Sequence, residues 1–225
     1  MFVQSNDYRI DEYSSLRQRA EGELKGLMKD SEKMTKVACE KWLDVRSFGQ
    51  VFAYKASSAK KGDGVSVGVR GPVSIHPAFS VAPVNITSTQ ITKSVSDEAG
   101  NKKGSDTMGM KHRVDHGVYV FYGSINTQLA SRTGFSDEDA EVLKQSLIHL
   151  FDNDASSARP EGSMEVHKLV WWEHPNPTGK YSSAKVHRAL QVGVKDSVRD
   201  PASIEDYDIA IGELEGITTE VYTGH

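Results

Sequence analysis

Three consecutive segments restrict the fold more than any other feature of the chain: a strand-like run, a helix-like run and a second strand-like run. They are GVYVFYG (117–123), SDEDAEVLKQSLIHLF (136–151) and VHKLVWW (166–172). The helix-like run begins with Ser136 followed by Asp139, which is typical of a helix N-cap, and continues with an apolar stripe. Strand, helix and strand in this order form half of a ferredoxin-like sandwich, so we predict an α+β fold with a βαβ unit over 114–192.

Shorter patterns extend this fold toward both ends of the chain. Residues 13–43 carry apolar side chains near the helical period, which predicts one or two amphipathic helices. A stretch rich in Ser, Gly and Lys predicts a flexible loop at 55–68. Residues 193–225 are predicted to form an acidic C-terminal segment. Runs of β-branched and aromatic residues predict further strands at 48–55, 69–75, 84–92 and 186–192.

The composition suits one domain over residues 1–225 and excludes several classes of protein. With 37% hydrophobic and 26% charged residues, the chain can bury one core of ordinary size and carry insertions. No run approaches the roughly 18 apolar residues of a membrane helix, and the start lacks a signal-peptide pattern. We therefore expect a cytoplasmic protein with no membrane partner. The single cysteine, Cys39, excludes an internal disulfide and a cysteine-based zinc site.

Charge is unevenly distributed along the chain, although its net value is only -4. Residues 55–115 hold nine Lys and Arg against five Asp and Glu, a net +4, whereas 195–225 hold two against eight, a net -6. Five of the nine basic residues lie in 92–113, which has glycine turns and little apolar material. This pattern predicts a protruding loop or hairpin, and loops of this length in compact domains usually have a function.

His112, Asp115 and His116 are residue types that bind metals or catalyse reactions, but their spacing does not suit either role. Side chains alternate along a strand, so the two histidines would share a face that excludes the aspartate. No nearby nucleophile with an oriented base completes a hydrolytic site. We therefore expect no metal, no cofactor and no catalytic residue.

A nucleic-acid interface fits the same stretch better. Basic side chains on a flexible segment can contact phosphates, and methionines can insert between bases. A solvated basic loop without a ligand explains the composition equally well. The RNA contacts that this hypothesis predicts are Lys93, Lys102, Lys103, Lys111, His112 and Arg113, with Met108 or Met110 as a wedge.

Several segments, which follow one another in a particular order along the chain, are similar to those of a known protein family. They are DVRSFGQVFA (44–53), VRGPVSI (69–75), VAPVNITSTQIT (81–92), TMGMKHRVDHGVYVFYGSIN (107–126), TGFSDEDAEVLKQSLIHLF (133–151) and DNDASSARPEGSM (152–164). In order and spacing they resemble the backbone subunit of the type I CRISPR surveillance complex, Cascade, within the RAMP superfamily. The type I-C branch is the most similar.

This resemblance implies an RRM-like (ferredoxin-like) palm with long insertions that form finger and thumb elements. The implied parts are a helical finger-like insertion at 1–43, palm strands at 44–92, a thumb-like hairpin at 92–113 and the palm βαβ unit at 114–192. The implied contacts to the RNA backbone are Arg46, Ser47, Lys111, His112, Arg113, Ser156, Ser157 and Arg159. Met108 is the implied wedge.

The resemblance further implies an RNA-binding scaffold, not an enzyme. Copies of the subunit would polymerise along a CRISPR RNA as a helical filament, join other Cascade subunits and present the guide to target DNA in a prokaryotic cell. Two alternatives remain open at this point. One is a type III-like backbone ribonuclease that cuts guide-paired RNA with a loop aspartate, and the other is a structural protein that self-assembles without nucleic acid.

One departure from the family pattern concerns the N-terminus. Members usually open with a strand, a turn rich in Asn, Gly and Pro, and a helix before the segment that matches MFVQSN at 1–6. We therefore expect the palm sheet of this chain to lack a strand and its RNA surface to be incomplete, as in a truncated or shortened form.

Overall fold

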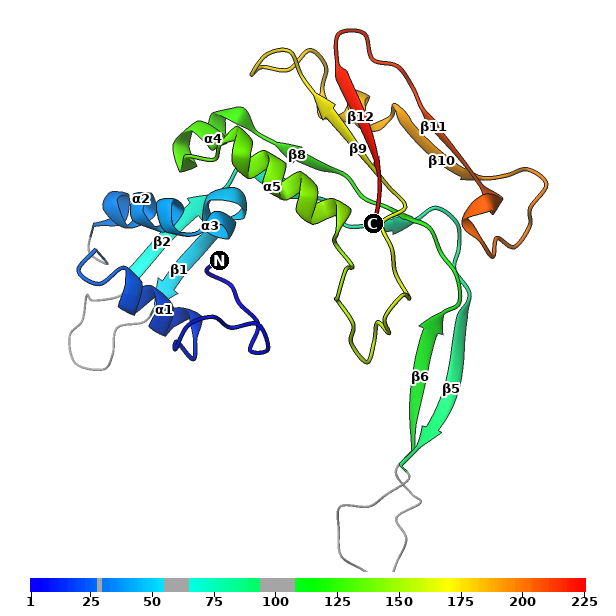
Figure 1. Ribbon diagram of the computed structural model, residues 1–225, viewed down its shortest axis with the longest axis horizontal. Helices are drawn as coiled ribbons and strands as arrows, with labels where there is room; N and C mark the ends of the chain where they lie inside the picture. Colours follow the sequence, from blue (N-terminus) through cyan, green and yellow to red (C-terminus); the bar gives the residue numbers. More distant parts are fainter. Residues whose placement is uncertain (28–29, 55–64, 94–107) are drawn as a thin grey trace, which may run out of the picture. The chain divides into compact units, whose positions relative to one another are not determined.

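The computed structural model describes the chain except for residues 28–29, 55–64 and 94–107 (Figure 1). The described residues form two compact units. One combines helices and strands, and the other consists mainly of strands. The N-terminal unit comprises Met1–Ile75, Gly123–Ser183 and Glu215–His225, and the hairpin unit comprises His76–Tyr122 and Ala184–Leu214. The prediction of an α+β protein is confirmed. The prediction of one domain over the whole chain is not decided by this division and stays a prediction.

Three short helices open the N-terminal unit: α1 (Leu16–Glu23), α2 (Ser31–Lys41) and α3 (Leu43–Phe48). The side chain of Ser15 accepts a hydrogen bond from the Gln18 amide and caps α1, and Asp30 caps α2 in the same way through Lys33. The helices predicted over 13–43 are therefore confirmed.

A two-stranded sheet follows, in which β1 (Gly49–Tyr54) pairs antiparallel with β2 (Val65–Arg70). A Cβ on Gly49 would lie 2.3 Å from the Val69 carbonyl oxygen, so only glycine allows this approach after α3. The strand expected at 48–55 is confirmed. The loop expected at 55–68 is wrong for residues 65–68, which belong to β2. Within this part of β2, Val67 is buried between the exposed Ser66 and Gly68. Residues 55–64 lie outside the described part.

The core of the N-terminal unit lies between these helices and this sheet, where α2 and α3 pack on β1 and β2 (Figure 1). The ring of Phe2 is fully buried, and its centroid lies 4.7 Å from that of Trp42 and 5.3 Å from that of Phe52. The first residues of the chain therefore supply a central aromatic side chain. The largest fully buried side chains are Phe2, Leu24, Met34, Val45 and Phe52.

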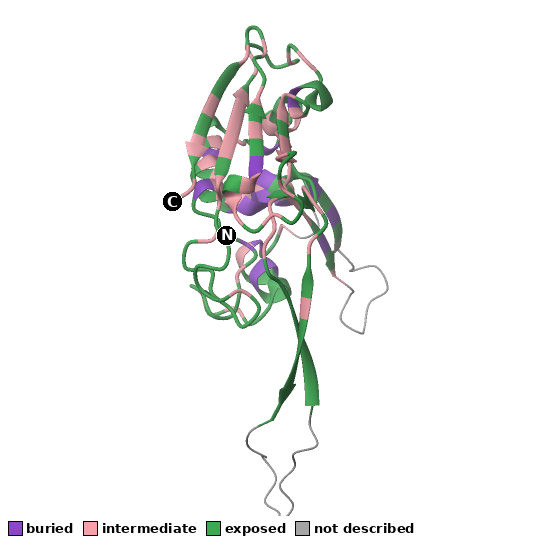
Figure 2. Ribbon diagram, turned by 90° about the vertical axis from the view of Figure 1, so that its right-hand side faces the viewer, coloured by how far each residue is buried: buried purple, intermediate pink, exposed green. Residues whose placement is uncertain are grey.

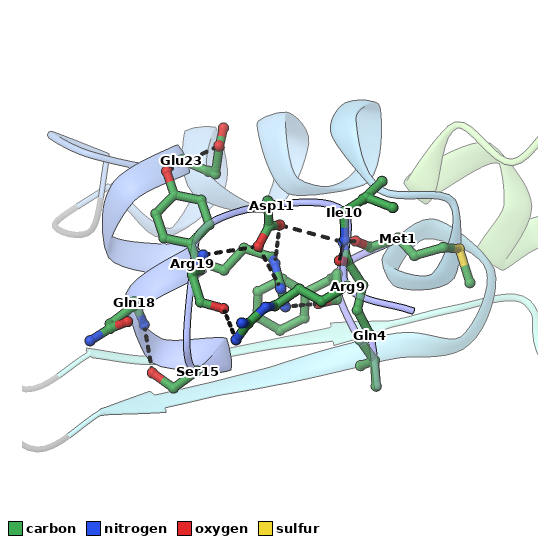
Figure 3. A network of polar contacts seen from close by, with 12 residues as sticks. Met1, Gln4, Arg9, Ile10, Asp11, Ser15, Gln18, Arg19 and Glu23 are labelled. Atoms are coloured by element: carbon green, nitrogen blue, oxygen red, sulfur yellow. Dashed lines mark hydrogen bonds and ion pairs between the residues drawn. The ribbon is translucent and has the colours of Figure 1, made fainter. Parts of the chain in front are cut away.

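A polar network holds the segment around Phe2 against this core. Asp44 accepts hydrogen bonds from the Phe2 amide at 2.7 and 2.9 Å and from the Val3 amide at 2.7 Å. Arg19, buried on α1, donates to the Phe2 carbonyl at 2.6 Å and binds both carboxylate oxygens of Asp11 at 2.6 and 2.8 Å (Figure 3). The Arg19 hydrogen bonds hold the pKa of Asp11 below its usual range.

The second part of the N-terminal unit begins with a small antiparallel sheet, in which β3 (Val73–Ile75) pairs with β8 (Gly123–Ile125). A short helix, α4 (Thr127–Thr133), follows; Asn126 caps its start, and Gly134, with φ 77°, ends it. No helix is predicted there from the sequence. The helix predicted over 136–151 is confirmed as α5 (Asp137–Ile148), with a capping box between Ser136 and Asp139, and ends three residues earlier.

A second sheet in the N-terminal unit pairs β9 (Lys168–Glu173) with β12 (Thr218–Thr223), antiparallel. The strand predicted over 166–172 is thus confirmed. Its partner comes from the acidic segment, for which no strand is predicted. Lys144 of α5 lies over this sheet, 5.5 Å from the centroid of the Trp171 ring, and bonds to Glu141 and Glu220, which raise its pKa.

The described residues of the hairpin unit form three antiparallel strand pairs. The pairs are β4 (Phe79–Ser80) with β7 (Tyr119–Val120), β5 (Ile86–Thr92) with β6 (Met108–Val114), and β10 (Leu190–Val194) with β11 (Tyr207–Ile211). Helix α6 (Ser183–His187) leads into β10, and a short 3-10 helix, η1 (Ile204–Asp206), leads into β11. The strand predicted at 84–92 is confirmed as β5. Of the hairpin predicted at 92–113, residues 108–113 lie in β6, which pairs with β5, and residues 94–107 lie outside the described part of the chain.

Three predicted strands are wrong in their extent. The strand expected at 69–75 is divided between β2, which ends at Arg70, and β3, which begins at Val73. The strand expected at 117–123 divides into β7 and β8, which pair with β4 and β3, respectively. These partners are themselves separated by a segment that contains Pro77, which has no amide hydrogen to continue a ladder. The strand expected at 186–192 starts only at Leu190, because the preceding residues form α6.

Every sheet in the described part of the chain consists of two antiparallel strands. Strand β9 pairs with β12 and not with the strand that precedes α5. Among the described helices, none is both long enough and apolar enough to cross a membrane.

The burial of Phe2 generates a test of this core. We expect Phe2→Ala to lower the free energy of unfolding by about 3–5 kcal/mol, because it leaves a cavity beside Trp42 and Phe52. Val3→Ala is the matched control: the Val3 side chain is 56% exposed and only its amide contacts Asp44, so we expect a change below about 0.5 kcal/mol. Urea unfolding followed by tryptophan fluorescence measures both. Equal losses in the two variants would contradict this description of the core.

Candidate nucleic-acid interface

The ribbon formed by β5 and β6 exposes both of its faces to solvent, and Figure 2 shows its strands almost entirely in the colour of exposed residues. The register pairs Ile86 with Val114 at one end and Thr92 with Met108 at the other. Because side chains alternate across a strand, this register assigns each residue to one of two faces. Neither β5 nor β6 contains an acidic residue.

One face of the ribbon, called here the basic face, carries two cations among threonine hydroxyls. Lys111 lies opposite Thr89, and Arg113 lies opposite Thr87. Arg113 donates through Nε to Asp115 at 2.8 Å, and the Thr87 hydroxyl donates to the same carboxylate. These two hydrogen bonds hold the pKa of Asp115 below its usual range. The ion pair is exposed, so a phosphate can compete for Arg113.

The opposite face, called here the methionine face, carries Met108, Met110 and His112. The methionine side chains are 62% and 54% exposed. Nδ1 of His112 is 2.8 Å from the Ser88 hydroxyl, and the side-chain amide of Gln90 donates through Nε2 to the Met108 sulfur at 2.9 Å. The predicted set of Lys111, His112 and Arg113 is therefore divided, with the histidine on the face opposite the two cations.

The remaining predicted residues of this stretch lie beyond the ends of the ribbon's strands. Lys93 directly follows β5 and is exposed. Lys102 and Lys103 lie outside the described residues. Met108, Lys111, His112 and Arg113 thus lie on one described strand, two on each face of the ribbon.

Arg46 and Ser47 lie in α3, where the structure gives both residues packing contacts. Nε and Nη2 of Arg46 bind the two carboxylate oxygens of Asp139 at 2.7 and 2.6 Å, and Nη1 donates to the Cys39 carbonyl at 3.2 Å. This pairing raises the pKa of Arg46 and lowers that of Asp139. Ser47 is buried. An RNA phosphate would have to compete with Asp139 for the planar fork of this guanidinium.

Ser156, Ser157 and Arg159 lie in the exposed loop between α5 and β9. The Ser156 amide donates to the Arg159 carbonyl at 2.7 Å, and the Arg159 amide donates to the Ser156 hydroxyl at 3.0 Å. The guanidinium of Arg159 lies 3.0 Å from Asp154, which is also exposed. The loop therefore presents its serines and its cation on one tight turn.

The structure does not gather His112, Asp115 and His116 around one point. Strand β6 ends at Val114, Asp115 turns back toward Thr87, and the ring centroid of His116 lies 5.9 Å from that of Tyr207. In the described part of the chain, a different group of metal-ligating residues does converge: His149, Asp152 and His225. The spacing of His149 and Asp152 was visible in the sequence, but the approach of His225 was not.

The double role of Asp139 generates a test of stability. We expect Asp139→Asn to lower the free energy of unfolding by about 2 kcal/mol, because it leaves the half-buried Arg46 without its charged partner. Since the folded-state pKa of Asp139 is lowered, its contribution is present above the ordinary value of 3.8 and is lost as the pH falls below it. Chemical unfolding at pH 7 and pH 3 measures this change. The exposed Asp137→Asn in the same helical turn is the control, and an equal loss there would contradict the role of the ion pair.

The pairing of Arg113 with Asp115 generates a test of charge on the ribbon. We expect Asp115→Asn to raise the salt concentration at which the protein elutes from heparin, because it removes an acid and releases Arg113. Asp200→Asn makes the same charge change at an exposed site on another loop and is the control. If both substitutions shift elution equally, net charge and not the release of Arg113 is responsible.

Comparison with known proteins identifies the family of the chain. A family model described as CRISPR-associated protein Cas7 matches residues 1–212. The CRISPR-associated protein Cas7 of Haloferax volcanii is 25% identical over 181 residues, which are 76% of this chain and 52% of that protein. The chain thus spans about half the length of this curated relative. Because the family model covers nearly all of the sequence, the chain belongs to the CRISPR-associated protein Cas7 family.

Proposed function

We propose that this chain is a CRISPR RNA-binding backbone subunit of a type I, I-C-like Cascade complex, and that it is a scaffold and not a nuclease. The observation that carries the proposal is the β5–β6 ribbon, which exposes a basic face and a methionine face in a member of the Cas7 family. The described residues of β5 and β6 include no buried side chain. An isolated two-stranded hairpin is marginally stable in water, so its exposed faces are suited to a ligand.

The basic face suits contacts to the RNA backbone. Lys111 and Arg113 can neutralise phosphates, and the hydroxyls of Thr87 and Thr89 can donate to phosphate or accept from a 2′-hydroxyl. These groups bind without distinguishing bases. A subunit that holds a guide must leave base edges free for pairing with a target, so contacts of this kind are the ones that the function requires.

The methionine face suits a contact to bases. Met108 and Met110 are flexible apolar side chains that project from the ribbon into solvent, and such side chains can insert between stacked bases. Opening one base step costs about a few kcal/mol, which phosphate neutralisation on the other face offsets. We assign Met108 as the wedge and His112 as a hydrogen-bond donor through its remaining ring nitrogen.

The contacts proposed in the N-terminal unit differ in how readily they reach RNA. An exposed turn carries Ser156, Ser157 and Arg159, which can contact the RNA backbone directly. Arg46 and Ser47 are proposed to act mainly by packing α3, since their polar groups are engaged or buried. Lys93, Lys102 and Lys103 are proposed as additional phosphate contacts near the tip of the hairpin.

The assembly is likewise a proposal. Copies of the chain, together with other Cascade subunits, would form a helical filament along the guide and present it to target DNA in the prokaryotic cytoplasm. An RRM-like palm is part of the same proposal. The net charge of -6 over 195–225 against +4 over 55–115 supports contacts between neighbouring copies.

RNA binding is the direct test. Protein stripped of nucleic acid in high salt is titrated with fluorescent guide RNA, in the presence and absence of its Cascade partners. We expect saturable binding, and we expect the double substitution Lys111→Ala and Arg113→Ala to weaken it. The slope of the logarithm of the binding constant against the logarithm of the salt concentration should become shallower by about 1.4, the value for two phosphate contacts on a single strand. Lys168→Ala, an exposed lysine on β9, is the control.

Three outcomes would overturn the proposal. The first is unchanged RNA binding by the double variant, and the second is no binding even with the partners present. The third is metal-dependent cleavage of guide-paired RNA that a single Asp→Ala substitution abolishes, which would establish the type III-like ribonuclease instead.

A further inference from the structure

We propose that His149, Asp152 and His225 form a binding site for a divalent first-row transition metal ion. Nδ1 of His149 lies 2.7 Å from Oδ2 of Asp152, and Nδ1 of His225 lies 3.3 Å from the same oxygen. The three ligand atoms all lie within 4.8 Å of one another. All three residues belong to the N-terminal unit.

The local fold explains why these side chains converge. Helix α5 ends at Ile148, His149 is its C-cap, and the Asp152 amide donates to the His149 carbonyl at 3.1 Å, which folds both side chains onto one turn. His225 lies two residues after the end of β12 at Thr223. A Cβ on Gly224 would lie 1.8 Å from the Val166 carbonyl oxygen, so glycine is required for the chain to pass this backbone and bring His225 to Asp152.

The donor set suits zinc or copper. Two imidazole nitrogens and one carboxylate oxygen are the usual ligands of Zn²⁺, and water completes a four-coordinate site. With metal–ligand bonds of about 2.0–2.1 Å, neighbouring donors in a tetrahedron lie about 3.3 Å apart. The 3.3 Å pair already has this separation, and the 2.7 Å pair reaches it by a small side-chain rotation.

The exposure of the site sets what kind of site it is. The side chains of His149, Asp152 and His225 are 44%, 34% and 73% exposed, so the metal would exchange with solvent and would retain at least one water ligand. Copper should bind more tightly than zinc, in the usual order for such ligands. The site begins the loop that carries Ser156 and Arg159, so a bound ion would attach the start of that loop to the end of β12.

Metal titration of the full chain tests the proposal without reference to RNA. Protein without a histidine affinity tag is treated with chelator, and Zn²⁺ is added in a calorimeter. We expect one ion per chain, and at least tenfold weaker binding by His225→Ala and by Asp152→Asn. His76→Ala, an exposed histidine of the hairpin unit, is the control and should bind as wild type does.

Electron paramagnetic resonance of added Cu²⁺ identifies the ligands. We expect hyperfine coupling to two nitrogens in the wild type and to one in His149→Ala or His225→Ala. The proposal is overturned if binding does not saturate at one ion per chain, if the two histidine variants bind as tightly as His76→Ala, or if neither variant loses a nitrogen. Each of those results would leave only a hydrogen-bonded His–Asp cluster.

Discussion

The carboxylate of Asp139 connects parts of the N-terminal unit that lie 93 residues apart in the sequence. It closes the capping box of α5 with Ser136 and also binds Arg46 of α3 through both of its oxygens. Because both groups are largely removed from water, either charge left alone would be costly, which keeps α3 and α5 matched. Helix α3 in turn supplies the buried Val45 and leads through Gly49 into β1. The sheet and the aromatic core around Phe2 are thus coupled to the helix that carries the loop with Arg159.

The hairpin ribbon follows the opposite physical logic. Its strands have no buried side chain in the described structure, and neither face covers a core. A protein gains little stability from such an element, so its retention is understandable when a ligand covers it. Its faces differ in chemistry, with cations and hydroxyls on one and thioethers and an imidazole on the other. That difference follows from the alternation of side chains along β6.

The sequence predicted local features well and the partners of strands poorly. The capping box of α5 and the helices before β1 were accessible because their signals are contained within a few residues. Helix α4 was missed although Asn126 and Gly134 mark its ends, since its seven residues include weak helix formers such as Thr and Ser. The strand over 117–123 failed for another reason: its two halves pair with different strands, and nothing in the run itself reveals this.

The sequence by itself determined the family of the chain, the start of its principal helix and the position of β5. Only the tertiary structure decided that Arg46 binds Asp139, that His112 lies opposite the cations beside it in the sequence, and that His225 meets Asp152. The physical reason is range. A cap depends on residues three apart, whereas an ion pair or a strand register depends on which distant segments pack together, and that is settled by the free energy of the whole fold.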